Sequence, residues 1–202
     1  MKKIWVAVLA LGLATAFAGK VYAGTGQADD KSHEVYDIKG QTLVDLQDLQ
    51  KKFTALAGAV PADKYTWRPA EGVRSIAEVY LHVTQANYGF TKFIGAAPPV
   101  DFKTKDFEKS TTDKAKIIEQ LNASFDYTRG VIEKLSNTDL QKALKEFGPD
   151  ANWGDVLYIT AAHDHEHLGQ SIAYARMNGI VPPWTAEAMK KAAEKGGAAP
   201  QE

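Results

Sequence analysis

The densest group of side chains able to do chemistry lies between residues 159 and 177, which hold three of the chain's five histidines. On a helix, His163 and His167 lie about 40° apart on one face, because side chains four residues apart are neighbours. Neutral imidazole is a common ligand of zinc, nickel, iron and copper, so two imidazoles one turn apart can grip one metal ion. The same H-x-x-x-H pattern also fits two polar residues at a helix boundary, so it indicates a metal site only together with a third ligand.

The residues around this pair separate into an apolar stripe and flanking polar positions. The largely apolar residues Val156, Ile159, Tyr174 and Met177, together with Gln170, fall on or beside the stripe of His163 and His167, which we expect the helix to turn towards a core. His165 lies about 160° from His167, and we expect it to face solvent. Asp164 and Glu166 flank the stripe; either could orient an imidazole or accept a proton, but we expect both to be surface charges. Gln170 is the better candidate for an amide that orients a ligand.

His82 offers the third nitrogen, on a second segment that we expect to be helical from Ser75 to about Gly95. Ser75 is a predicted N-cap, with Glu78 three residues on as its capping-box partner. The apolar positions of this segment are spaced by 3 and 4 residues and comprise Ile76, Val79, Val83, Ala86, Phe90 and Phe93. His82 lies on this apolar flank, where a lone histidine fits a hydrogen-bonded core residue as well as a metal ligand.

Two further segments repeat the same helical spacing, and together the four predict an all-α four-helix bundle. The first runs from Thr42, its predicted N-cap, to Val60, and its apolar seam comprises Leu46, Leu49, Phe53, Leu56 and Val60. The third covers residues 113–135, with a seam of Ile118, Leu121, Phe125, Thr128, Ile132 and Leu135. The helix that carries the histidine cluster is predicted to begin after Asn152. It is predicted to end at residue 178, with Gly179 in the left-handed conformation that terminates a helix. In a bundle, inward-pointing ligands of facing helices build a metal site, and three protein ligands leave a position for water.

The connecting segments supply candidate walls for such a site. We expect Trp67 to cover one end of the core and Arg68 to be solvated, although Arg68 could face an anionic ligand. Residues 95–112, which include Pro98, form a long connection that could pack as a flap. A short helical stretch is predicted for residues 138–147. Residues 185–202 form a polar tail rich in Ala, Lys and Glu that could begin as a short helix.

Residues 1–23 are predicted to be a secretory signal peptide, with Lys2 and Lys3, an apolar run, and Val21-Tyr22-Ala23 as the cleavage site. The alternative is an uncleaved membrane anchor. The apolar run is short for that role, because a membrane-spanning helix needs about 20 apolar residues. Residues 24–41, rich in Gly, Asp, Lys and Ser, are expected to be a mobile leader. We therefore expect a periplasmic or secreted protein with no stable membrane insertion after cleavage. The absence of cysteine excludes disulfides and thiolate ligands, and the net charge of −1 gives no basic field for nucleic acid.

Several short motifs resemble the DinB-like, or YfiT-like, proteins over roughly residues 41–184. They are Trp67-Arg68-Pro69, Ser75-Ile76-Ala77-Glu78 leading to His82, His163-x-x-x-His167-x-x-Gln170, Tyr174-x-Arg176, and Gly179-Ile180-Val181-Pro182-Pro183. The resemblance implies a four-helix bundle, a homodimer, and a divalent metal ion held by His82, His163 and His167. It also implies that some relatives are transferases or isomerases using low-molecular-weight thiols. An export signal departs from the mostly cytoplasmic pattern of the family and argues against such thiol chemistry here.

Two main hypotheses for function follow. The first is a metal-dependent enzyme, of hydrolase or transferase type, acting on a small-molecule substrate at an open coordination position. The second is a non-catalytic envelope module that binds a metal or a partner. A third, a membrane-tethered interaction protein, requires that the signal segment be retained. Zinc or nickel is the expected ion and iron is possible, because three nitrogens suit all of these and copper too. The substrate and any catalytic residue stay unassigned.

Overall fold

The computed structural model describes residues 37–99, 102 and 105–196. The predicted signal peptide, residues 1–23, and most of the predicted leader, residues 24–41, lie outside these residues. The described chain is all-α, as predicted; its one isolated β-bridge joins Ala143 to Asn152. None of the helices formed by these residues is long and apolar enough to cross a membrane.

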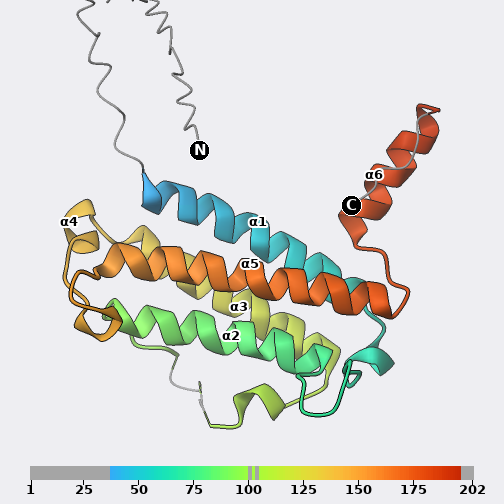
Figure 1. Ribbon diagram of the computed structural model, residues 1–202, viewed down its shortest axis with the longest axis horizontal. Helices are drawn as coiled ribbons and strands as arrows, with labels where there is room; N and C mark the ends of the chain where they lie inside the picture. The colour runs from blue at the N-terminus through green and yellow to red at the C-terminus, as the bar shows by residue number, and fades with distance from the viewer. Residues whose placement is uncertain (1–36, 100–101, 103–104, 197–202) are drawn as a thin grey trace, which may run out of the picture. The chain divides into compact units, whose positions relative to one another are not determined.

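Four long helices form the bundle (Figure 1). They are α1 (Ile38–Ala59), α2 (Ile76–Phe93), α3 (Lys114–Glu133) and α5 (Trp153–Met177). Helix α1 packs against α3 and α5, and α2 packs against the same two helices. Consequently α1 and α2, although successive in the chain, are not each other's main packing partners. This arrangement sets the middle of α2 beside the middle of α5, which are the two helices that carry the predicted ligands.

The core consists of the predicted seams, closed by aromatic side chains. All five seam residues of α1 are buried, and Phe53 packs against Tyr80 of α2 and Phe125 of α3 at ring-centroid distances of 6.3 and 5.8 Å. The other seams are followed less strictly. Ile117 is fully buried in α3 whereas Ile118 is only partly buried, and Phe93, at the end of α2, is 38% exposed. The loss of burial at Phe93 is consistent with its place in the last turn, where the chain leaves the bundle.

Helix α1 begins four residues before the predicted start. Its N-cap is Asp37, whose Oδ1 accepts a hydrogen bond from the Gly40 backbone amide at 2.9 Å. The predicted cap, Thr42, is instead a buried residue inside the helix. Because Ile38 and Leu43 pack against the core, the extra turn is stabilised by apolar contact, which the polar composition of residues 24–41 did not reveal.

The ends of α2 and α5 follow the prediction. Ser75 and Glu78 form the predicted capping box at the start of α2. Asn152 caps α5, and at its other end Gly179 has φ +73°. The Gly179 amide donates to the Arg176 carbonyl at 2.9 Å, and the Ile180 amide donates to the Ala175 carbonyl at 2.9 Å. This pair of bonds is a Schellman motif, in which a left-handed glycine terminates the helix.

The shorter elements differ from the single stretch predicted for residues 138–147. The structure has α4 (Asn137–Leu140) and the 3₁₀ turn η3 (Lys145–Phe147), separated by a pairing with the segment before α5. The Leu144 amide donates to the Ala151 carbonyl, and the Trp153 amide donates to the Lys142 carbonyl. These long-range bonds replace helical ones. The 3₁₀ turns η1 (Ala62–Lys64) and η2 (Phe107–Lys109) lie in the other connections, and α6 (Pro183–Glu194) forms most of the predicted tail.

Candidate metal centre

Three imidazoles meet where α2 faces α5. His82 projects from α2, and His163 and His167 project from successive turns of α5. Each ring offers a nitrogen, and these nitrogens all lie within 4.8 Å of one another. The ring centroids are 4.4 to 5.0 Å apart. The structure therefore brings together the three residues that the sequence singled out, across 81 positions of the chain.

The arrangement of ring nitrogens fits a metal ion. Gln170 Oε1 lies 2.8 Å from His167 Nδ1, and Glu108 Oε1 lies 2.7 Å from His82 Nδ1. Because both oxygens can only accept, each Nδ1 is the protonated donor and each Nε2 keeps its lone pair. His163 Nε2 lies 3.1 Å from His82 Nε2. Two nitrogens bound to one tetrahedral zinc ion at about 2.0–2.1 Å are separated by roughly 3.3 Å, so this spacing suits a shared ion.

Each oriented imidazole is held by a longer chain of contacts. Gln170 Nε2 donates to the Tyr174 hydroxyl at 3.0 Å, and the Tyr174 ring packs edge-on against Trp67 at 5.5 Å. Gln170 is thus placed as the sequence predicted. Trp67 packs against the core, which agrees with its predicted covering role. On the other side, the Arg74 guanidinium holds Glu108 through Nε at 2.6 Å and Nη2 at 3.1 Å.

The electrostatics around His82 and His167 favour the neutral imidazole, the form that binds metal. Burial lowers the pKa of His82, and the opposing hydrogen bond with Glu108 does not reverse the shift. Burial also lowers the pKa of His167. Burial by itself would raise the pKa of Glu108, but hydrogen bonds from Arg74 and His82 outweigh it and leave the pKa lowered. Neutral imidazoles beside a charged carboxylate are the state that a divalent cation requires.

The polar residues next to the ligands divide differently from the prediction. Asp164 was expected to be a surface charge, and this is wrong: its side chain is completely buried, and neither carboxylate oxygen has a hydrogen-bond partner among the described residues. Burial raises its pKa to about 6. Asp164 Oδ1 lies 3.6 Å from His163 Nδ1. This nitrogen is also buried and has no hydrogen-bond partner among the residues that the structure describes. His165 is half-exposed, as predicted, with Nε2 3.3 Å from Asp45 Oδ2, and Glu166 is exposed.

A pocket of about 320 Å³ opens beside His82. It is lined by His82, Gln85, Ala86, Gly89, Phe90, Phe93 and Glu108. The Phe90 ring stands edge-on to His163 at 5.3 Å, so the apolar wall reaches the histidine cluster. A more polar pocket of about 440 Å³ is also lined by Glu108, together with Arg68, Arg74, Lys109 and neighbouring residues.

The walls of these pockets correct part of the sequence-based picture. The pocket beside His82 is lined by α2 and by Glu108, which lies in the flap predicted for residues 95–112, whereas neither Trp67 nor Pro98 lines it. Arg68 is 41% exposed, pairs with Glu78 at 3.1 Å and lines the polar pocket, but it does not line the pocket beside His82. Glu108 and Arg74 were missed altogether. Both lie in irregular segments outside the long helices, so no periodicity marked them.

Comparisons with known proteins agree with this fold. A family model described as the DinB superfamily matches residues 45–171. A DinB-like protein of Bacillus cereus ATCC 10987 is similar in structure, with a TM-score of 0.62, 16% identity, and coverage of 71% of this chain and 95% of that one. A DinB-like protein of Bacillus subtilis, YjoA, has a TM-score of 0.55 and 21% identity, covering 69% and 92% of the two chains. YfiT of Bacillus subtilis, described as a probable metal-dependent hydrolase with an unusual four-helix bundle topology, has a TM-score of 0.55 and 14% identity, covering 70% and 88%. No curated protein sequence gives a significant match.

Proposed function

Because the chain belongs to the DinB superfamily and brings three histidines together, we propose that it is a metal-dependent enzyme of hydrolase or transferase type. His82, His163 and His167 would hold a divalent ion through Nε2. The donor set suits zinc or nickel best and also accommodates iron. The likeness to YfiT supports the hydrolase form of this proposal.

The observation that carries the proposal is the pocket beside His82. The histidine group includes no fourth His, Cys, Asp or Glu ligand among the residues that the structure describes. The nearby carboxylate, Glu108, is engaged by His82 Nδ1 and Arg74. Three protein ligands with an open side are the arrangement of a catalytic site, whereas a structural site has its coordination sphere filled.

When bound, such an ion supplies Lewis-acid chemistry: it polarises a carbonyl or phosphoryl oxygen and makes a nucleophile available near neutral pH. The chain's own residues position the substrate. Phe90 and Phe93 provide an apolar wall that excludes water from one side of the reacting group. Glu108 fixes the orientation of His82 and is itself fixed by Arg74, so the open side of the cluster is rigidly defined.

Metal analysis of single variants tests the ligand set. His82→Ala, His163→Ala and His167→Ala each remove one of three protein ligands, and we expect bound zinc to be lost after dialysis. His165→Ala is the matched control, because this histidine belongs to the same sequence cluster but lies half-exposed. Zinc content is measured by atomic absorption on folded protein. Loss of zinc from His165→Ala with retention by His82→Ala would refute the bundle-core site.

Substitution of Gly89 tests whether the pocket receives the substrate. Gly89 lines this pocket and a Cβ there meets no atom within 4 Å, so the backbone accepts a side chain at this position, and a leucine would occupy part of the pocket. Replacing an interior helical glycine also favours the helix, by up to about 1 kcal/mol. Gly130→Leu in α3 is the control, since its Cβ likewise meets nothing within 4 Å and it does not line this pocket. We expect Gly89→Leu to keep its zinc and its fold but to lose hydrolysis of 4-nitrophenyl esters, while Gly130→Leu keeps all three.

Other outcomes of this experiment are equally decisive. Full zinc occupancy without turnover on activated esters, amides and phosphoesters would favour the non-catalytic envelope module. Turnover that is unchanged in Gly89→Leu would place the substrate elsewhere.

We also propose export to the periplasm or the medium. The support is the charged start, short apolar run and small-residue cleavage site within residues 1–23. N-terminal sequencing of protein from the exported fraction should give a mature chain that starts at Gly24. Intact protein starting at Met1 in a membrane fraction would show an anchor instead.

A further inference from the structure

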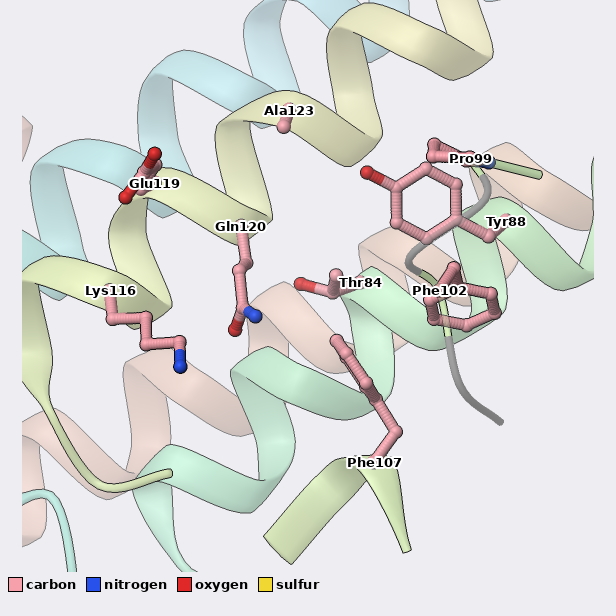
Figure 2. Close-up of a pocket in the computed structure, with 9 residues that line it drawn as sticks. All are labelled: Thr84, Tyr88, Pro99, Phe102, Phe107, Lys116, Glu119, Gln120 and Ala123. Atoms are coloured by element: carbon pink, nitrogen blue, oxygen red, sulfur yellow. The ribbon is translucent and has the colours of Figure 1, made fainter. Parts of the chain in front are cut away.

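Two cavities lie against opposite faces of α2. The one between α2 and α3 is lined by Thr84, Tyr88, Phe102 and their neighbours (Figure 2). Thr84 lies about 160° around α2 from His82, because each residue of a helix turns by about 100°. The pocket beside His82, in contrast, has a ligand of the histidine cluster in its lining. A substrate of the metal centre would therefore lie in this pocket, whose shape and charge indicate the class of substrate.

The pocket beside His82 runs along one face of α2. Its lining on this helix extends from His82 to Phe93, which is about 16 Å at 1.5 Å per residue. Ala86, Gly89 and Phe93 all lie within about 40° of His82 around the helix. Because the side chain is small at Ala86 and missing at Gly89, these two positions form the floor of the pocket. The space is consequently elongated, with the histidine cluster at one end.

Aromatic rings bound this space at its side and its far end. The Phe90 ring stands edge-on to the His163 ring, with 5.3 Å between centroids. The Phe93 ring is held edge-on against Phe147 of η3, with 4.8 Å between centroids. Aromatic faces and edges of this kind favour an apolar group, above all another ring, which can stack on them or pack edge-on against them.

The pocket offers no positive charge to a substrate. Glu108 is the one charged residue of its lining, and Gln85, the remaining polar residue beside His82, is neutral. The basic residues of this region line the polar pocket instead: Arg68, Arg74 and Lys109. Because a charged group loses much free energy when it is buried without a partner, a substituent that lies in the pocket beside His82 is neutral.

We propose that the substrate carries a neutral, apolar group about the size of a phenylethyl group, which lies along α2 between Ala86 and Phe93 while the reacting oxygen faces the histidines. An apolar cavity of about 150 Å³ holds benzene, so a pocket of about 320 Å³ leaves room for a ring and a short chain. Esters and amides of arylalkanoic acids belong to this class, whereas phosphomonoesters and dicarboxylic acids do not. The inference rests on the proposed function, because it names the substrate class of that same site.

Three hydroxamic acids test the inference by binding alone, since they share one metal-binding group and differ in their tails. Acetohydroxamic acid has a methyl tail, 3-phenylpropanohydroxamic acid a phenylethyl tail, and succinic monohydroxamic acid a carboxyethyl tail. Isothermal titration calorimetry on the zinc-loaded protein measures the Kd of each. A fully buried methylene strengthens binding by roughly fourfold. In a pocket that is open on one side, the phenylethyl tail should bind at least about tenfold more tightly than the methyl tail. The carboxyethyl tail should bind no more tightly than the methyl tail.

Two substitutions test where the apolar tail lies. Gly89→Leu occupies part of the pocket, and Phe93→Ala removes the ring at its far end. Each should reduce the preference for the phenylethyl tail to about threefold or less, while acetohydroxamic acid binds as tightly as it does to the wild type. Phe102→Ala is the matched control, because it removes a ring from the other cavity (Figure 2) and should keep the full preference. Zinc content and melting temperature show for each variant that the metal centre and the fold are intact.

The outcomes distinguish this inference from the proposed function. Equal affinity for all three tails, or tightest binding of the carboxyethyl probe, would overturn the inference and leave the open metal site in place. Failure of every probe to bind the zinc-loaded protein would overturn the open coordination position, and the inference with it. An unchanged preference in both Gly89→Leu and Phe93→Ala would place the apolar group elsewhere and overturn the inference alone.

Discussion

Truncating Glu108 should weaken metal binding more than truncating Gln170, although the two residues do the same geometric task. Each accepts a hydrogen bond from Nδ1 of one histidine, at 2.7 Å for Glu108 and 2.8 Å for Gln170. With distances this similar, charge makes the difference. Glu108 is a carboxylate held by Arg74, whereas Gln170 is a neutral amide held by Tyr174.

The magnitudes follow from the type of hydrogen bond. A neutral bond contributes about 0.5–1.5 kcal/mol, and one to a charged group about 1.5–3 kcal/mol. Partners that orient a metal-binding imidazole typically change affinity by about 10–100-fold, or roughly 1.4–2.7 kcal/mol. We therefore expect a loss near the middle of this range for Glu108→Ala and roughly a threefold to tenfold loss for Gln170→Ala. Glu108→Gln keeps an acceptor but removes the charge, and it should fall between the two.

Competition with a chromophoric chelator at fixed pH measures the zinc affinity of each variant. Asp45→Ala is the matched control, because Asp45 also pairs with a histidine, His165, but that histidine is outside the cluster. Melting curves of the metal-free variants separate a loss of affinity from a loss of fold. The reasoning fails if Gln170→Ala weakens zinc binding as much as Glu108→Ala does, or if Asp45→Ala matches either.

Two further predictions concern stability. Chelation should lower the melting temperature by roughly 5–10 °C while leaving a cooperative transition, because an ion at one hundred times its Kd adds about 2.7 kcal/mol to a bundle that already has its own core; a random-coil circular dichroism spectrum would contradict this. In the metal-free protein at pH 8, the Asp164→Asn variant should be more stable than the wild type by on the order of 2 kcal/mol. Burial raises the pKa of the Asp164 carboxyl to about 6, so at pH 8 the wild type must keep a charged carboxylate buried, which lowers its free energy of unfolding. That advantage should fade as the pH falls from 6 towards 4, where the wild-type carboxyl becomes neutral in the folded state; urea unfolding that shows a constant difference between pH 8 and pH 4 would argue against it.

Much of the bundle could be predicted because its helices are amphipathic and punctuated by local signals. Spacings of 3 and 4 residues marked every long helix, and Ser75, Asn152 and Gly179 marked their ends through bonds within a few residues. Helical geometry also sufficed to separate His165 from the other two histidines of α5. These features depend on the chain over a turn or two, which is the range that a sequence pattern describes.

Glu108 could not be predicted, because its role depends on distant parts of the chain. It lies in a 3₁₀ turn between α2 and α3, and it is placed by Arg74, 34 residues earlier. The start of α1 was misplaced for a related reason. Asp37 is a favourable N-cap residue, but the first turn of α1 is stabilised mainly by Ile38, which packs on the core of the folded protein.

Asp164 was misjudged because a helix in this bundle buries more than one stripe. Helix α5 packs against both α1 and α2, so positions beside the His163 and His167 stripe are covered as well. A carboxylate buried without partners is costly, and so is the unpaired Nδ1 of His163, yet the two atoms are only 3.6 Å apart. In the structure, two of the three imidazoles have an acceptor at Nδ1: Glu108 for His82 and Gln170 for His167. These two bonds fix the orientation of the rings and leave Nε2 of each free to bind a metal ion. This pattern is a stronger argument for a metal-binding role of the cluster than the proximity of the three rings alone.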